Sequence, residues 1–208
     1  MLFFILSGSA EAVPLIGTCY GYNYLVKHVA DQNFVDSTHI KSFRHGYDWG
    51  SMEKVMSDNG WGFPALVNAI ADYYPPMDEC GEKIFVLNFW HPTKMLSPGG
   101  EEDSADFLET WRVHPSYEDD FYYFCHDLAY YLHTIAGVNW FILHNEPDLY
   151  YGGGSNWRNW KSSPADFADQ CRMAAEAIKD AVPYAYAVYG AFANEDPATL
   201  LYTPLWIR

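Results

Sequence analysis

An amide and a carboxylate, Asn145 and Glu146, stand side by side after the short apolar segment Trp140 to Leu143 and a single histidine, His144. A short apolar run of aromatic and β-branched residues is typical of a buried β-strand. Pro147 follows, and because proline lacks a backbone N–H and disfavours helical backbone in the residue before it, the strand is predicted to end here. The sequence thus presents a carboxyl group where a strand gives way to a loop, which suits general acid and base chemistry.

Cleavage of a glycosidic bond is a reaction that such a carboxyl group serves. One carboxyl group protonates the leaving oxygen, and a second acts as nucleophile in retaining enzymes or as base to a water in inverting enzymes. The Asn-Glu-Pro sequence after a strand resembles the acid/base signature of the clan A glycoside hydrolases. The resemblance implies a (β/α)8 barrel in which Glu146 ends the fourth strand as the acid/base and Asn145 binds the sugar 2-hydroxyl.

Strand-like and helix-like segments alternate along the chain, which is the pattern of parallel βα units. Strands are predicted at 15–20, 39–44, 83–89, 139–144 and 184–189, and helices at 24–31, 64–73, 117–135 and 165–181. These make up about five of the eight units of a complete barrel. The predicted fold class is therefore α/β, an incomplete (β/α)8 TIM barrel that forms the N-terminal part of a longer catalytic domain. The alternative is an open α/β sheet that folds alone or with a partner chain.

Polar and aromatic residues follow two other predicted strands, and barrel enzymes keep their active sites at these carboxyl ends. Arg44 and His45 follow the second strand, and Arg44-His45-Gly46 resembles family 39, in which an arginine near this place braces the catalytic carboxylates. Asn88, Trp90 and His91 end the third strand, where Trp90 can stack on a sugar ring and His91 can bind a hydroxyl. The structural alternatives are a surface ion pair for Arg44, a core histidine for His45, and packing at the barrel top for the other three.

A glycine-rich loop after the fourth predicted strand carries further aromatic side chains. Tyr150 is the first candidate for sugar binding in this loop, and Tyr151, Trp157 and Trp160 are further candidates for the walls of the cleft. Aromatic residues make up 18% of the chain, so core packing and sugar stacking are both expected to use them.

The second carboxylate of the pair has no clear candidate in the sequence. In the clan the nucleophile is a Glu after the seventh strand, whereas Glu195 lies near the end of the fifth predicted strand. We therefore expect the nucleophile beyond the end of this chain, and we expect the 208-residue chain alone to be inactive. Membership of the clan implies a retaining enzyme with a covalent glycosyl intermediate and neither metal nor organic cofactor.

Two families within the clan resemble the motif and its surroundings. The order of Asn-Glu-Pro-Asp-Leu, a helix and a strand is similar to family 39, the β-xylosidases and α-L-iduronidases. Asn-Glu-Pro-Asp-Leu-Tyr is also similar to family 79, the β-glucuronidases and heparanase-like enzymes. His144 stands where family 39 often has Trp and family 79 often has Gly. Two other classes of function remain open, namely a carbohydrate-binding relative without hydrolysis and a βα scaffold in which the motif is coincidental.

Charge and motif content exclude several classes of partner. The formal net charge of −15 disfavours nucleic acid and anionic membrane surfaces, and no apolar run approaches the length of a membrane helix. No phosphate-binding loop, nucleophile elbow or dinucleotide motif is present, and no metal-ligand spacing accompanies His126 and His133. We therefore expect a carbohydrate substrate, no metal and no membrane insertion.

The N-terminus and the cysteines bear on the cellular compartment. Residues 1–12 contain a short apolar run and an Ala-x-Ala match, which predict the remnant of a secretory signal peptide and a secreted protein, with the domain at 13–208. The alternative is that residues 2–6 form a strand of the fold. The four cysteines are widely spaced, and both free thiols and up to two disulfides fit the sequence.

Overall fold

Five strands form one parallel sheet in the computed structural model, which describes residues 17–19, 42–71, 82–89, 112–147, 150–151, 157–158, 160 and 162–191. Their order across the sheet is that of the chain: β1 (Gly17–Cys19), β2 (Ser42–Asp48), β3 (Glu82–Asn88), β4 (Trp140–Asn145) and β7 (Tyr186–Ala191). Two further strands, β5 (Tyr150–Tyr151) and β6 (Trp157–Arg158), pair antiparallel after β4. A sheet in which each new strand is added on the same side differs from a doubly wound sheet, whose strand order reverses.

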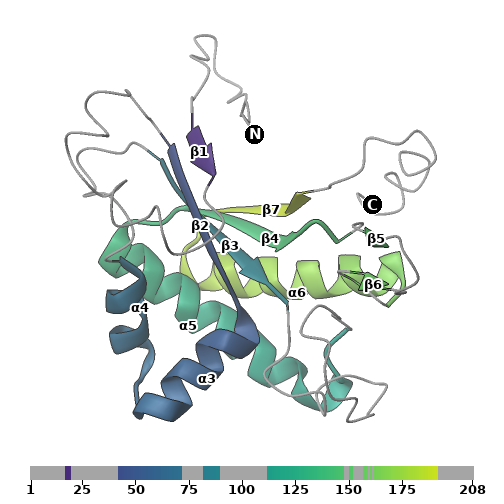
Figure 1. Ribbon diagram of the computed structural model, residues 1–208, viewed down its shortest axis with the longest axis horizontal. Helices are drawn as coiled ribbons and strands as arrows, with labels where there is room; N and C mark the ends of the chain where they lie inside the picture. Colours follow the sequence, from purple (N-terminus) through teal and green to yellow (C-terminus); the bar gives the residue numbers. More distant parts are fainter. Residues whose placement is uncertain are drawn as a thin grey trace.

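The described helices lie together on one face of this sheet (Figure 1). They are α3 (Trp49–Asn59), α4 (Phe63–Ala71), the 3₁₀ helix η2 (Pro115–Tyr117), α5 (Glu118–Ala136) and α6 (Pro164–Ala181). Local sequence sets their ends. Ser163 and Asp166 form a capping box at the start of α6, and Gly137 ends α5 in the left-handed conformation.

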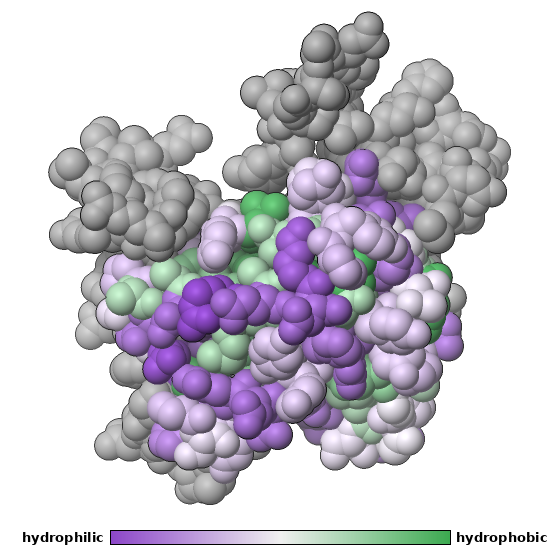
Figure 2. Space-filling model, turned by 180° about the vertical axis from the view of Figure 1, so that it is seen from behind, coloured by the Kyte–Doolittle hydropathy of each residue, from purple (hydrophilic) through white to green (hydrophobic). Residues whose placement is uncertain are grey.

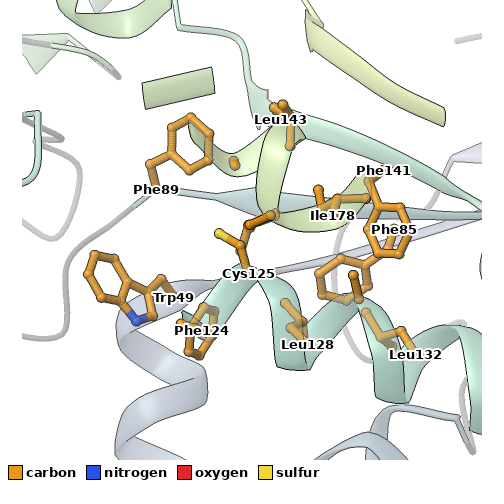
Figure 3. Packing of buried hydrophobic residues seen from close by; sticks show 14 of the residues in the cluster. Trp49, Phe85, Phe89, Phe124, Cys125, Leu128, Leu132, Phe141, Leu143 and Ile178 are labelled. Carbon is orange, nitrogen blue, oxygen red and sulfur yellow. The ribbon is translucent and has the colours of Figure 1, made fainter. Parts of the chain in front are cut away.

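The main core lies between the sheet and α5 and α6 (Figure 3). Phe85 pairs with Phe141 and Leu87 with Leu143 in the β3–β4 register, and all four side chains belong to this core. Because side chains alternate along a strand, the intervening residues of β3 and β4 point to the opposite face of the sheet. That opposite face is where Arg44, Ile84 and Asn88 lie.

The observed elements agree closely with those predicted. The second to fifth strands and the last three helices are confirmed within a few residues. The strand predicted at 39–44 instead spans Ser42–Asp48, and the prediction missed α3, which begins directly after it with Asp48 as its N-cap. The helix predicted at 24–31 and the N-terminal segment 1–12 lie outside the described residues. The described fold is an α/β fold with a parallel sheet, and the closed barrel stays a prediction.

The described surface is predominantly polar where Figure 2 shows it. Hydrophilic side chains form a broad band across this face, and the apolar patches between them are small. None of the helices in the described part of the chain is long and apolar enough to cross a membrane.

Candidate active site

Three of the predicted site residues meet in one hydrogen-bonded network. The Arg44 guanidinium on β2 donates from Nη2 to Asn145 Oδ1 at 2.5 Å. The backbone N–H of Asn145 in turn donates to Asn88 Oδ1, at the end of β3, at 2.9 Å. Asn145 at the end of β4 is thus held by its side chain and its main chain, and Glu146 is the next residue.

The network determines how the Asn145 amide is oriented. A guanidinium group only donates hydrogen bonds, so the end of the amide that faces Arg44 must be the acceptor Oδ1. The donor Nδ2 is then the other end of the amide.

We expect Arg44 and Asn145 to be energetically coupled. Substitutions Arg44→Met and Asn145→Leu each remove one partner of a charge-assisted hydrogen bond, so their effects on the free energy of unfolding should not add. We expect a coupling of about 1 kcal/mol in a double-mutant cycle measured by urea unfolding. Additive effects would show that the two side chains act independently.

The backbone around Glu146 is unusual because two non-glycine residues have positive φ. His144 has φ of 67° and Glu146 has φ of 50°. Left-handed backbone in residues with a β-carbon costs roughly 1–3 kcal/mol each, and such residues cluster at functional sites. Gly190 of β7 has φ of 43°, and a β-carbon there would lie 3.4 Å from Pro147 Cγ. The end of β7 therefore packs against the turn that carries Glu146.

His144 points into the core, contrary to the alternation of a regular strand. Its side chain is 1% exposed and its ring contacts Phe89, Trp160 and Phe167. His144 Nδ1 accepts a hydrogen bond from the backbone N–H of Phe89 at 3.0 Å. Sequence reasoning assigned this histidine no role, because a single histidine at the end of a strand carries no spacing signal.

The structure places several other predicted site residues away from this network or leaves them out. His45 is 4% exposed and lies on the helix-facing side of β2, where its ring contacts Tyr47 at a centroid distance of 4.8 Å. Trp160 is 3% exposed within the core, so the expectation that it forms a wall of a sugar cleft was wrong. Trp90, His91 and the side chain of Tyr150 lie outside the described residues, as does Glu195.

Gly46 has a packing role beside these residues. A β-carbon at Gly46 would lie 2.7 Å from Val86 Cβ and 2.9 Å from the Val86 carbonyl oxygen. The glycine of the Arg44-His45-Gly46 sequence is therefore required for close approach of β2 to β3.

Burial lowers the pKa of His45 from 6.5 to about 4, because the charged imidazolium loses its hydration. At pH values between these two pKa values, His45 binds a proton in the unfolded chain but not in the folded chain. Folding stability should therefore fall as the pH falls from about 7 toward 4. We expect a His45→Leu variant to lack this contribution, so that the stability of the wild type relative to the variant declines with falling pH. Urea unfolding of both proteins at a series of pH values measures this decline. A difference in stability between the two proteins that does not change with pH would contradict the prediction.

Asp48 ends β2 and caps the helix that follows it. Asp48 pairs in register with Asn88, but its carboxylate caps α3 by accepting from the Ser51 N–H at 2.6 Å.

Among the residues that the structure describes, no group of three His, Cys, Asp or Glu side chains is arranged to hold a metal ion.

Comparison with known proteins gives a likeness of fold. No protein-family model matches the sequence, and no curated protein matches it either. The structure is similar to that of a point variant of the glycoside hydrolase GH5_18 from Streptomyces cattleya in complex with Manβ1-4GlcNAc, with a TM-score of 0.51 and 12% sequence identity. A structure of GH5_18 from Streptomyces cattleya in complex with GlcNAc gives a TM-score of 0.48 and 15% identity. Each match covers 79% of this chain and 38% of the other chain, so the chain spans well under half of these neighbours.

Proposed function

We propose that the chain carries the acid/base half of the active site of a retaining glycoside hydrolase, with Glu146 as general acid and base. The network that Arg44, within β2, forms with Asn145 and Asn88 at the carboxyl ends of β4 and β3 carries this proposal. It holds the residue before Glu146 from β2 and β3, of which β3 is the neighbour of β4. The likeness of fold to a glycoside hydrolase supports the same class of activity.

Each member of the network has a distinct part in the proposed reaction. Glu146 protonates the glycosidic oxygen as the bond to the sugar breaks, and its carboxylate then takes a proton from the water that attacks the intermediate. Asn145 donates from Nδ2 to the 2-hydroxyl of the sugar. Arg44 orients Asn145 and supplies positive charge beside the carboxylates. The nucleophile is a second Glu, which we place outside these 208 residues.

The substrate is proposed to be a glycoside or oligosaccharide joined by an O-glycosidic bond. Within the clan, we propose that the motif belongs to family 39 or family 79. The neighbour's complex with Manβ1-4GlcNAc adds this disaccharide to the compounds to be tested.

The stereochemistry of the first product tests the proposal. We expect the full-length protein to release a sugar with the anomeric configuration of the substrate, as followed by ¹H NMR during hydrolysis of aryl β-glycosides and of Manβ1-4GlcNAc. We expect the 208-residue chain alone to bind sugar without turnover. A product of inverted configuration would overturn the retaining mechanism, and binding without turnover by the full-length protein would instead identify a carbohydrate-binding relative.

A further inference from the structure

Two unusual hydrogen bonds join β3 to β4 just beyond the last register pair that the two strands form. The ladder between these strands ends at the pair Leu87 and Leu143. Beyond it, the Phe89 N–H donates to His144 Nδ1 at 3.0 Å and the Asn145 N–H donates to Asn88 Oδ1 at 2.9 Å. Each of the two segments, 88–89 and 144–145, therefore offers one side-chain acceptor to a backbone N–H of the other. We call this pair of bonds the reciprocal clasp.

We propose that His144 and Asn88 are positioning residues that, through the reciprocal clasp, hold Glu146 in its left-handed turn. This proposal rests on the proposed role of Glu146 as acid/base. The clasp fixes the side chain of His144 and the backbone of Asn145 to residues 88 and 89, and Glu146 follows immediately with φ of 50°. A strained turn persists only where its surroundings over-determine it, and the clasp provides such surroundings.

The hydrogen bond at Nδ1 determines which nitrogen of the His144 ring carries the proton. Because Nδ1 accepts the Phe89 N–H, it carries no proton, and a neutral ring then carries its proton on Nε2. The ring stacks on Phe89 at a centroid distance of 5.5 Å and meets Trp160 and Phe167 edge-on at 6.1 Å and 6.0 Å. These contacts orient the acceptor toward the β3 backbone.

Two variants at position 144 separate an acceptor role from a packing role. His144→Asn keeps an acceptor near the position of Nδ1 and tolerates left-handed backbone, but it loses the ring. His144→Phe keeps the ring and its stacking, but it leaves the Phe89 N–H without this acceptor. If His144 acts only by packing, then Phe should preserve the turn at Glu146 better than Asn does. If His144 acts as a hydrogen-bond acceptor that positions Glu146, then Asn should preserve the turn better than Phe does. At position 88 the matched pair is Asn88→Asp, which keeps the acceptor, and Asn88→Leu, which removes it.

NMR on the 208-residue chain tests the clasp without any need for activity. In the wild type we expect a scalar coupling across the hydrogen bond between Phe89 N and His144 Nδ1, and backbone shifts of Glu146 that report positive φ. In His144→Phe we expect exchange of the Phe89 amide to be about tenfold faster and the positive φ of Glu146 to be lost. His144→Asn should retain both. The opposite order of the two variants, or an unchanged Glu146 in His144→Phe, would overturn the proposal.

Kinetics of the full-length protein then link the clasp to catalysis. Misplacing the acid/base should lower kcat by up to about a hundredfold in His144→Phe while KM changes little, and Asn should restore most of the loss. If the NMR experiments give the expected results but neither the wild-type full-length protein nor its variants at position 144 cleave glycosides, then the proposed function is wrong. The structural role of the reciprocal clasp is still supported in that case. If Glu146 proves essential for turnover but both variants at position 144 retain the kcat of the wild type, then the clasp is not a positioning device.

Discussion

Replacing Glu146 with Gln should lower kcat/KM for a glycoside with a poor leaving group by a factor of about 10²–10⁴. Gln has nearly the same shape but cannot transfer a proton to the leaving oxygen. A leaving group that departs without protonation, such as a dinitrophenolate, needs no acid in the first step, so that step should be affected much less. Steady-state and pre-steady-state rates for a series of aryl glycosides of different leaving-group pKa would measure this difference.

Two companion experiments make the Glu146 prediction specific. Azide added to a Glu146→Ala variant should restore turnover and yield a glycosyl azide, because a small anion can attack the intermediate without a general base. Glu82→Gln is the matched control, since Glu82 lies at the opposite end of β3 and accepts from Trp140 Nε1 at 2.5 Å, a bond that Gln can keep. An equal loss of rate for good and poor leaving groups would refute the acid role.

The second large effect should come from Phe121→Ala, at an expected cost of about 3–5 kcal/mol in the free energy of unfolding. Phe121 of α5 is 0% exposed and its ring contacts Trp49 at 5.1 Å and Phe89 at 5.5 Å. Removing it leaves a cavity where α3, α5 and the end of β3 meet. Because the backbone of Phe89 donates to His144, the cavity should also loosen the reciprocal clasp. Urea unfolding measures the first effect, and amide exchange at Phe89 measures the second.

Tyr123→Ala is the matched control for this prediction. Tyr123 is an aromatic residue on the same helix but is 65% exposed, so its removal should change stability by less than about 1 kcal/mol. Similar losses for the two variants would mean that α5 does not pack on the sheet as described.

The sequence predicted the elements well because most of them carry strong local signals. For example, α6 begins at Pro164 and carries a regular apolar stripe, and an apolar run before Pro147 forms β4. The missed helix α3 has a weaker signal, because its face toward the core is narrow and only Trp49 and Met52 are buried. Its N-cap, Asp48, is also the last residue of β2, so the strand and the helix follow each other without a loop.

The site was predicted in part, and the failures have physical causes. Arg44 and Asn145 were selected by their resemblance to clan A enzymes, and Asn88 by its place at the end of the third predicted strand. The structure brings these three together, although Arg44 lies within β2 and does not follow it as predicted. His45 was grouped with Arg44 by adjacency, whereas alternation along a strand sends neighbouring side chains to opposite faces. His144 was overlooked because the positive φ that turns it into the core depends on tertiary contacts, which no local pattern encodes.

The left-handed turn has a consequence for engineering this protein. Glycine or asparagine adopts such backbone at lower cost, so replacing Glu146 by either should raise the melting temperature even as it removes the carboxylate. Selection for heat resistance alone would therefore tend to erase the proposed chemistry first. A stabilisation campaign should exclude residues 144 and 146 from its library, and gains in stability at these two positions would themselves mark where stability has been given up for function.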